Sequence, residues 1–391
     1  MKQNDTTRVL HVTSHNEECG IARYQEQFID GMRSDSTIKN SYFNHSPYET
    51  RFMSKQQYNK VLDDFRVQVL NNDLIHIQHE LAFYKHRELK SMVKISHKFH
   101  KKVMITIHTA LDVEYKRAHL KGYGFRSVLS YIKQLRIQKG FERMHLNPIK
   151  KADLIIVHNK ATKQSLINHG FKKPKIKTIR MPIPTLSIKG SSTHIKKSLG
   201  YKKKDIIFCT VGFISRTKGV DQAVKALLLL PENYKLAIIG GLHPRGQDAQ
   251  YLKEIEEFIK ENNLESRVYI SGYIKDDQKL NMYIRECDIC VYPYDAEYYS
   301  YVSSAALSNA IANHKPVIAY PTPTFKEINS KSEEVVVFCQ SPSVSELANK
   351  IRSLNIKKQT DISTEYAEKY NYTKEALKFA SIYHKLLNKN I

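Results

Sequence analysis

Cysteine is scarce in this chain of 391 residues, which has five cysteines. An odd and sparse set argues against a disulfide framework. Cys287 and Cys290 form a CxxC pair, a spacing that also occurs in zinc and redox sites. The pair lies in ECDICVYPY, which is typical of a buried strand, and no second pair completes a zinc site. We therefore expect these cysteines to be structural.

Long apolar runs are also lacking. None approaches the roughly 18 residues that a membrane-spanning helix needs, and Ile206–Ile214 is among the longest. The first residues, MKQNDTTRVLHV, enter a strand-like run without the apolar core of a signal peptide. We expect a cytoplasmic protein.

Acidic residues are few beside basic ones, since 62 Lys and Arg against 39 Asp and Glu give a net charge of +23. Such a field favours polyanions, whether nucleic acid, anionic lipid or phosphorylated substrates. Charge alone does not choose between them, and a Lys-rich chain can also reflect genome composition. No recognised nucleic-acid-binding module is present, so nucleic acid is not among the expected partners.

Strands and helices alternate along the chain, and its length allows two domains with a core each. Apolar runs predict buried strands, each followed by helical spacing, and this rhythm indicates parallel sheets covered on both faces. The expected strands are 8–13, 74–78, 103–108, 154–157, 206–212, 236–240, 268–271, 287–292 and 316–319. Prolines and a polar run at 189–204 predict a linker between the two series.

One insertion, residues 116–151, stands out because it holds ten Lys and Arg and a single acid, Glu142. Apolar residues recur through it at roughly helical spacing. This pattern predicts a basic amphipathic helix at a membrane surface or on an acidic partner. The alternative is a solvated helix that covers the edge of the sheet.

Three turns carry residues suited to an anion. Gly20 follows the first strand and opens a helix, and helix starts favour anions. Arg216, Lys218 and Gly219 lie in VGFISRTKG, where two cations before a helix can neutralise a diphosphate leaving group. Ser303 and Ser304 begin a helix of small residues, as N-caps or as phosphate contacts. Each turn also has a plainer interpretation, as connector, surface charge or cap.

Histidines gather at the ends of two predicted strands, where doubly wound folds keep their chemistry. His76 and His79 end one strand and His108 ends the next. Each could bond a sugar hydroxyl or a phosphate, or be a satisfied structural histidine. A zinc site from His76, His79 and Glu80 is an alternative, although no HExxH is present.

These segments, in this order and spacing, resemble the GT-B glycosyltransferases of the retaining family 4 type over most of the chain. The segments are CGIARY at 19–24, HIQHE at 76–80, TIHT at 106–109, RTKG at 216–219, GGLHP at 240–244 and the stretch 303–319. The resemblance implies an α/β fold of two Rossmann-like doubly wound domains facing a cleft. It implies an acceptor-side domain at 1–185, a nucleotide-sugar domain at 186–364 and a helix at 365–391 that crosses back.

The resemblance also implies roles for individual residues. Gly20 would face the donor diphosphate and His108 the sugar or phosphate. Arg216 and Lys218 would be the cations that contact the phosphates. We expect these two residues and His108 to carry catalysis. Gly219, Ser303 and Ser304 would bind the donor, and family members need no metal or other cofactor.

The chain departs from the family at two glutamates eight positions apart. Tyr301 and Asn309 stand at those places. Asn309 can still hydrogen-bond a ribose hydroxyl. Glu297 or Asp295, which lie nearby in the sequence, are the candidates to replace the carboxylate near the sugar. Phe213 stands where the family has an arginine.

The prediction is a metal-independent, retaining hexosyltransferase for surface polysaccharide synthesis. It would move a sugar from a nucleotide-sugar to a glycan or lipid-linked acceptor, in the cytoplasm or at the inner membrane face, with an anionic membrane surface as a candidate partner. The alternative is a non-catalytic GT-B protein that acts as partner of another transferase.

Overall fold

The chain forms two compact units, which we describe separately. A computed structural model describes residues 6–14, 20–50, 52–81, 83–84, 88–113, 115–120, 122, 124–243, 248–301, 303–330 and 332–387. Unit 1 consists of Met1–Met181, Tyr301–Ser303 and Tyr372–Ile391. Unit 2 consists of Pro182–Ser300 and Ser304–Asn371.

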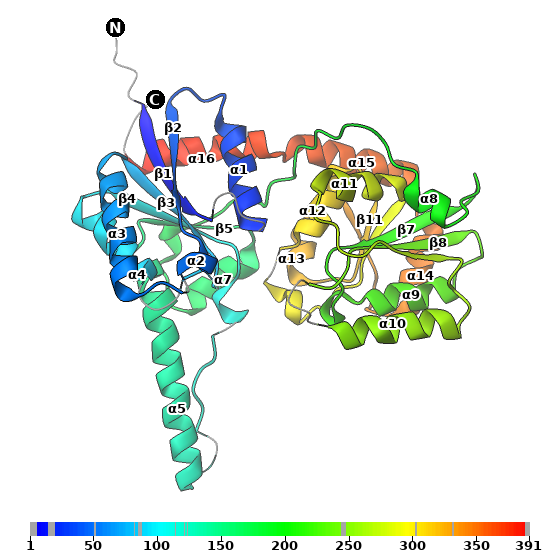
Figure 1. Ribbon diagram of the computed structural model, residues 1–391, viewed down its shortest axis with the longest axis horizontal. Helices are drawn as coiled ribbons and strands as arrows, with labels where there is room; N and C mark the ends of the chain where they lie inside the picture. The colour runs from blue at the N-terminus through cyan, green and yellow to red at the C-terminus, as the bar shows by residue number, and fades with distance from the viewer. Residues whose placement is uncertain are drawn as a thin grey trace. The chain divides into compact units, whose positions relative to one another are not determined.

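Unit 1 is built on a parallel sheet of six strands in the order β2-β1-β3-β4-β5-β6 (Figure 1). Its strands are β1 (Thr7–Thr13), β2 (Ile38–Asn44), β3 (Leu74–His79), β4 (Lys102–Ile107), β5 (Leu154–Val157) and β6 (Ile176–Thr178). Its helices are α1 (Gly20–Met32), α2 (Pro47–Thr50), α3 (Lys55–Leu70), α4 (Glu88–Lys98), α5 (Phe125–Phe141), α6 (Asn147–Lys150), α7 (Lys160–Asn168) and α16 (Tyr372–Leu386). Short turns of helix are η1 (Leu111–Val113), η2 (Glu142–Leu146) and η3 (Lys173–Lys175).

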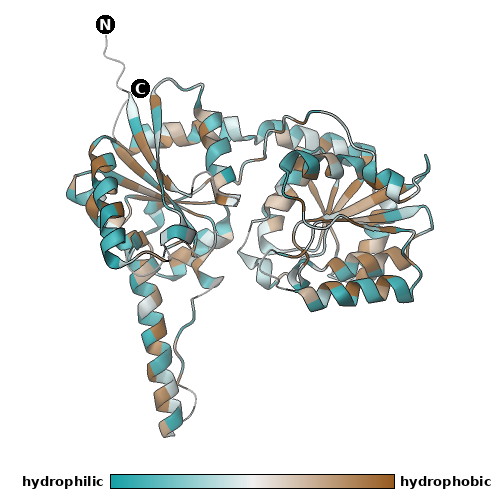
Figure 2. Ribbon diagram, viewed as in Figure 1, coloured by the Kyte–Doolittle hydropathy of each residue, from teal (hydrophilic) through white to brown (hydrophobic). Residues whose placement is uncertain are grey.

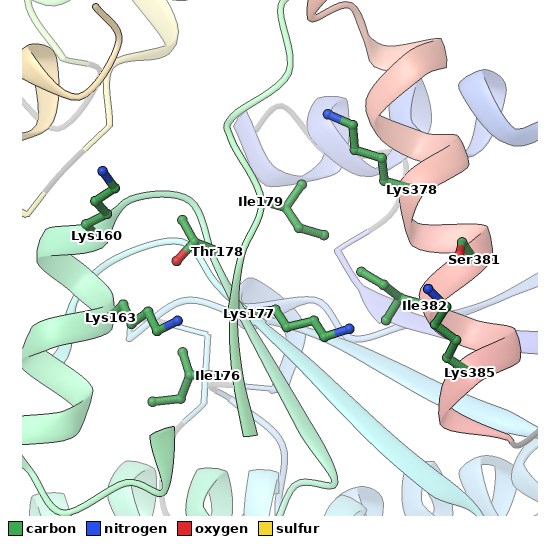
Figure 3. A pocket seen from close by; sticks show the side chains of 10 residues that line it. All are labelled: Lys160, Lys163, Ile176, Lys177, Thr178, Ile179, Lys378, Ser381, Ile382 and Lys385. Atoms are coloured by element: carbon green, nitrogen blue, oxygen red, sulfur yellow. The ribbon is translucent and has the colours of Figure 1, made fainter. Parts of the chain in front are cut away.

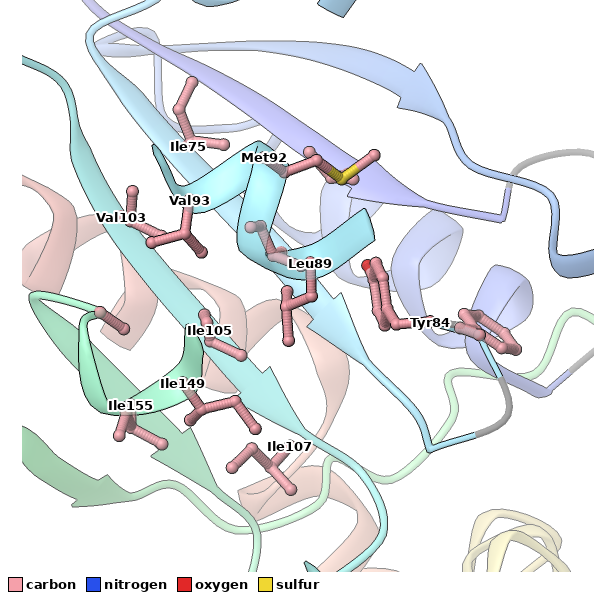
Figure 4. Packing of buried hydrophobic residues seen from close by; sticks show 14 of the residues in the cluster. Ile75, Tyr84, Leu89, Met92, Val93, Val103, Ile105, Ile107, Ile149 and Ile155 are labelled. Carbon is pink, nitrogen blue, oxygen red and sulfur yellow. The ribbon is translucent and has the colours of Figure 1, made fainter. Parts of the chain in front are cut away.

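Apolar side chains cover both faces of this sheet, which is why its central strands are continuous apolar runs. On one face α4 presents Leu89, Met92 and Val93, spaced one helical turn apart, to the strands (Figure 4). They pack with Ile75 and Ile105, among others. Each such side chain, fully buried, contributes roughly 1.5–3 kcal/mol relative to an exposed one.

The other face of the sheet is covered by α1 and by α16, which belongs to the end of the chain. The two helices lie so close that a Cβ on Gly31 would come within 2.8 Å of the Tyr372 carbonyl oxygen. The rings of Phe28 and Phe379 meet edge to face at 4.4 Å. A helix therefore ends the chain on unit 1; it begins at Tyr372, a few residues after the predicted boundary at 365.

Unit 2 repeats the architecture with the strand order β12-β11-β10-β7-β8-β9, again all parallel. Its strands are β7 (Ile206–Val211), β8 (Tyr234–Ile239), β9 (Val268–Ile270), β10 (Ile289–Tyr292), β11 (Val317–Ala319) and β12 (Val336–Phe338). Its helices are α8 (His194–Ser198), α9 (Val220–Leu228), α10 (Ala249–Glu261), α11 (Asp277–Glu286), α12 (Ala305–Ala312), α13 (Pro323–Lys326), α14 (Val344–Ser353) and α15 (Ile356–Lys369), with the short turns η4 (Arg216–Lys218) and η5 (Tyr298–Ser300). The apolar strands at the centre of each unit are plain in Figure 2.

Two sequence expectations, the linker and the helix over the sheet edge, meet a different structure, whereas the buried strand expected around the CxxC pair is confirmed. The polar stretch predicted as a linker contains the short helix α8, whose Ile195 is buried. The CxxC pair is buried and unbridged, and Cys209 Sγ lies 3.4 Å from Cys290 Sγ on the next strand. Helix α5 does not cover the sheet edge, since Phe141 at its end is its one buried residue and the helix stands out from unit 1 (Figure 1).

Of the helices within the described residues, none combines the length and the apolar character that crossing a bilayer requires.

Candidate functional site

The turn after β7 places a lysine over a glycine at the carboxyl end of the sheet of unit 2. Gly212 has φ +110°, a value that L side chains rarely adopt. A Cβ on Gly212 would lie 2.8 Å from the ammonium nitrogen of Lys218. The glycine therefore leaves room for the lysine head at this end of the sheet, where doubly wound folds bind ligands.

Lys218 carries a charge that its surroundings do not compensate. Its side chain is half-buried, and in the described part of the chain no carboxylate lies within ion-pair distance of it. Burial lowers the pKa of Lys218 to about 8. The ring of Phe213 lies 5.7 Å from the ammonium and stabilises its charge. A partly desolvated cation without a counterion is a site prepared for an anion.

Gly219 fixes the shape of this turn. It has φ +62° and stands at the N-cap of α9. A Cβ there would come within 2.2 Å of the Pro293 carbonyl oxygen, so no other residue fits without moving backbone. The amide of Asp295 donates to the Thr217 carbonyl at 2.9 Å, which ties the loop after β10 to the lysine turn.

Arg216 points elsewhere. Its guanidinium donates to Glu254 of α10 at 2.5 Å and lies over the ring of Tyr251 at 4.8 Å. The side chain is 61% exposed, and the hydrogen bond to Glu254 raises its pKa. The turn thus brings Lys218 and Gly219 together, while Arg216 is held on the surface by α10.

A second pair of glycines follows β8 beside this turn. Gly240 has φ +153°, and a Cβ on it would lie 2.0 Å from the Gly212 carbonyl oxygen. A Cβ on Gly241 would lie 2.5 Å from the Tyr273 amide. The ends of β7 and β8 therefore approach each other as bare backbone.

An aromatic stack, which sequence reasoning missed, stands next to Lys218. The rings of Phe213 and Tyr273 stack at 5.7 Å with an interplanar angle of 9°, and His243 packs on Phe213 at 4.7 Å. Tyr273 is 49% exposed. No motif signals Tyr273; it follows β9, and its contact with Phe213 arises only when the strand ends are side by side.

The helix start predicted at Ser303 and Ser304 is α12, which begins at Ala305. Ser304 is its N-cap, and the Ser304 hydroxyl accepts from the Leu307 amide at 3.2 Å. Ser303 belongs to unit 1, where its hydroxyl accepts from the Asn159 amide group at 3.4 Å. Asn309 is half-buried on α12 and Glu297 is exposed in the loop after β10.

In unit 1, His108 is a neutral hydrogen-bonding group. Its Nε2 lies 2.8 Å from the Gln78 side-chain oxygen, so Nε2 carries the proton and Nδ1 is left as an acceptor. Burial first, and then the neighbouring His158 and His79, hold the pKa of His108 well below its usual value. Gly20 begins α1 with open space around it, and residues 15–19 of the predicted loop lie outside the described residues.

The other strand-end histidines make structural contacts. His76 lies 2.7 Å from both the Tyr383 and the Thr106 hydroxyls, and His79 lies 3.2 Å from His145. Glu80 accepts from the Thr109 hydroxyl at 2.7 Å. Among the described residues, no three His, Cys, Asp or Glu side chains lie close enough together to hold a metal ion.

Two buried polar atoms beside His108 have no partner within the described residues: the Tyr24 hydroxyl and His158 Nε2. Their rings contact His108 at 4.8 and 5.3 Å. Buried polar atoms normally find partners, so this pair marks a place for a hydrogen-bonding ligand or water. Sequence reasoning missed both residues, although His158 follows a predicted strand.

Part of the chain is similar to a known protein family and to a curated protein. Residues 191–374 match the family of glycosyl transferases group 1. An uncharacterized glycosyltransferase of Methanocaldococcus jannaschii is 27% identical over 199 residues, which are 50% of this chain and 46% of that protein. The match thus spans about half the length of this relative.

Solved structures resemble the whole chain. The Anabaena protein HepE in complex with UDP and glucose has a TM-score of 0.67 at 16% identity, over 96% of this chain and 99% of that one. Sucrose-phosphate synthase from Thermosynechococcus elongatus has a TM-score of 0.67 at 18% identity, over 98% and 99%. At such identities the likeness shows the fold, and it confirms the predicted fold class.

Proposed function

We propose that this chain, which carries a glycosyl transferases group 1 domain in a GT-B fold, is a retaining glycosyltransferase that uses a nucleotide-sugar donor. The observation that carries the proposal is Lys218, a half-buried cation without an acidic partner among the described residues. It lies on a glycine turn at the carboxyl end of a parallel sheet, inside the matched domain.

Lys218 would act on the leaving group. Cleavage of the bond between sugar and diphosphate leaves the bonding electrons on a phosphate oxygen, and a fixed ammonium stabilises that charge as it forms. For retention, the same phosphate oxygen takes the proton of the acceptor hydroxyl, while that hydroxyl oxygen bonds to the anomeric carbon on the face the phosphate leaves. This route needs neither a protein nucleophile nor a metal.

The other residues would position the donor. The aromatic stack of Phe213 and Tyr273 supplies a face for the nucleobase. His108, neutral at physiological pH, would donate or accept a hydrogen bond to the sugar or phosphate. Asn309 and Glu297 stay proposals for the ribose and the sugar. A UDP-hexose is the donor we propose, since HepE was solved in complex with UDP-glucose.

The proposed acceptor is a glycan or a lipid-linked glycan at the cytoplasmic face of an anionic membrane, in the synthesis of surface polysaccharide. Helix α5 supports this. Phe125, Val128, Leu129 and Ile132 form a stripe at helical spacing and are 77%, 41%, 49% and 41% exposed. We call these four residues the α5 stripe.

The positive charge of α5 favours an anionic bilayer as the partner that covers the α5 stripe. The helix also carries Arg126, Lys133, Arg136 and Lys139 and no acid. A second copy of the same helix would bring like charges together, which disfavours self-association. Apolar side chains flanked by cations suit the anionic cytoplasmic leaflet.

A second candidate function is a non-catalytic partner of another transferase. The observation that favours it is the pair Tyr301 and Asn309 at the family's glutamate positions. Such a protein would bind no donor, or would bind one without cleaving it.

The first experiment measures binding and slow hydrolysis of UDP-, GDP- and ADP-sugars by the purified protein. We expect selective binding of one nucleotide, hydrolysis of its sugar, and release of the sugar with its anomeric configuration kept, as followed by NMR. Absence of binding to every donor, together with a stable complex with another protein, would favour the second function.

The membrane part has a matched pair of variants on α5. Ile132 lies on the stripe and Ile137, 62% exposed, lies off it. We expect Ile132→Ser to weaken co-sedimentation with phosphatidylglycerol-containing vesicles about tenfold, because burying an Ile side chain contributes roughly 1.5–3 kcal/mol. Ile137→Ser should bind like the wild type. Equal effects of the two substitutions would contradict docking through the α5 stripe.

A further inference from the structure

A groove on unit 1 is lined by five lysines. Its volume is about 740 Å³, and its lining comes from α7, β6 with the residue after it, and α16 (Figure 3). Among the described residues that line it, none is acidic or aromatic. The five lysines, which we call the groove lysines, are Lys160, Lys163, Lys177, Lys378 and Lys385.

Three groove lysines keep their charge unpaired. In the described part of the chain no carboxylate lies within ion-pair distance of Lys163, Lys177 or Lys385. Lys378 differs, because it donates to the buried Glu375 one turn earlier in α16. The groove therefore concentrates positive charge that the protein itself does not neutralise.

Protection of the sheet edge explains only part of this arrangement. β6 is an edge strand, and a lysine such as Lys177 discourages pairing with another chain. Lys163 on α7 and Lys385 on α16 are not on the edge strand, yet they line the same concavity (Figure 3).

We propose that the groove lysines bind a linear anionic glycan, a sugar chain with repeating phosphate or carboxylate groups. This rests on the proposed function and names the chemical class of its acceptor. Lysine is a rotatable point charge, whereas arginine grips a single phosphate in a fixed fork. A set of lysines therefore suits a run of charges. Thr178 and Ser381 line the groove with exposed hydroxyls that can bond sugar hydroxyls.

Two other polyanions fit the groove less well. Single-stranded nucleic acid binds through aromatic stacking platforms, and the described part of the lining includes no aromatic side chain. A bilayer surface needs exposed apolar side chains to enter it. The apolar residues here, Ile176, Ile179 and Ile382, are all buried, in contrast to the α5 stripe.

The test measures fluorescence anisotropy of labelled polygalacturonate and poly(glycerol phosphate), with neutral dextran as the uncharged probe. The groove variant is a triple substitution that combines Lys163→Gln, Lys177→Gln and Lys385→Gln. The control, Lys39→Gln with Lys55→Gln and Lys60→Gln, removes the same charge from other exposed positions of unit 1. The carboxylate and phosphate arms show which anionic group the groove takes.

We expect the wild type and the control to bind at least one anionic polymer and not dextran. The groove variant should bind about tenfold or more weakly. Its slope of log affinity against log salt should be shallower by about 2, because each neutralised charge contributes roughly 0.7–0.9.

Equal binding by wild type and groove variant would overturn the proposal, as would a wild type that binds neither polymer. So would oligo-dT or anionic vesicles that bind as tightly through the same three lysines. Donor hydrolysis is measured in parallel. Polymer binding lost in the groove variant with hydrolysis kept supports the groove. If the wild type cleaves no donor but binds the polymer through these lysines, the proposed transferase function is contradicted and the proposal for the groove is supported.

Discussion

The two units share one sheet architecture and differ in the polar groups they bury. Both have six parallel strands covered by helices. Unit 1 buries His11, His45, His76, His79, His145, His158 and His384. Among the described residues of unit 2 no histidine is buried, and its interior polar side chains include tyrosines and cysteines such as Tyr292 and Cys290.

The difference separates two kinds of recognition. Burial lowers the pKa of His11 and His158 in unit 1 to about 4, so these two histidines are polar and uncharged at neutral pH. They can place hydrogen bonds. Unit 2 instead holds a partly buried cation, Lys218, on a glycine turn with no carboxylate within ion-pair distance among the described residues. It can bind charge. A transferase needs both, a neutral surface for hydroxyls and a fixed charge for the leaving group.

The largest expected effect is a loss of stability in acid that is greater in unit 1 than in unit 2. The pKa values of His11, His145 and His158 are lowered to about 4, and that of His79 to about 3. The unfolded chain, with histidine pKa near 6.5, takes up protons first as pH falls. Stability is therefore full above about pH 6.5 and falls toward pH 4, by about 1.4 kcal/mol per histidine and pH unit. Hydrogen exchange by segment at pH 7 and pH 5 should show unit 1 opening first. If unit 2 opened first, the buried histidines would not be the main source of acid lability.

Next in size is the loss of turnover in Lys218→Ala. Removing one fixed charge-stabilising group from a transition state costs about 10²–10³ in kcat. Lys225→Ala, which removes a lysine of α9 paired with Asp221, is the control and should keep turnover within a few-fold. Because the pKa of Lys218 is lowered to about 8, kcat/KM of the wild type should decline above about pH 8. Turnover unchanged in Lys218→Ala would contradict the role of unit 2.

The third expected effect is a loss of stability of unit 2 in Gly240→Ala. The new Cβ would lie 2.0 Å from the Gly212 carbonyl oxygen, so backbone must move at the end of β7. We expect unit 2 to lose about 3 kcal/mol, the upper range for local backbone strain. Gly200→Ala, at φ +57° with open space around it, isolates the cost of the φ value at about 1 kcal/mol. Denaturant unfolding followed by segment-resolved exchange measures the stability lost in both variants. Equal losses would contradict the claim that the contact of the new Cβ with the Gly212 carbonyl adds to the cost.

The smallest effect separates a satisfied from an unsatisfied buried tyrosine. Tyr383→Phe removes the hydroxyl that lies 2.7 Å from His76, and should destabilise unit 1 by about 1–3 kcal/mol. Tyr320 of unit 2 is also buried, and its hydroxyl has no partner within the described residues. Tyr320→Phe should therefore be neutral or stabilising. Equal destabilisation by the two substitutions in chemical denaturation would show that the hydrogen bond to His76 contributes little.

The sequence predicted the fold best where strands are buried on both faces. Runs such as 206–212 and 154–157 are continuous and apolar, and they are the inner strands β7 and β5. Sequence reasoning missed β2, β6 and β12, which are all edge strands. β2 reads IKNSYFN, with polar residues on a half-exposed edge, and the other two have three residues each. Short or polar edges lack a periodic signal.

The candidate site was predictable as turns but not as contacts. Glycine and lysine in VGFISRTKG indicate an anion turn, and Lys218 lies over Gly212. The engagement of Arg216 by Glu254, 38 residues away, has no local signal. The same holds for the Phe213 and Tyr273 stack, because both depend on which strands become neighbours.

The most direct test of the account is a calorimetric titration of UDP, UMP and uridine into the wild type and Lys218→Ala. If Lys218 is the charge that receives the diphosphate, the variant should lose UDP affinity by about tenfold or more, equivalent to about 1.4 kcal/mol. UMP should lose less, and uridine should bind equally to both proteins. An equal loss for UDP and uridine, or no loss for UDP, would contradict the claim that unit 2 recognises the donor by its charge.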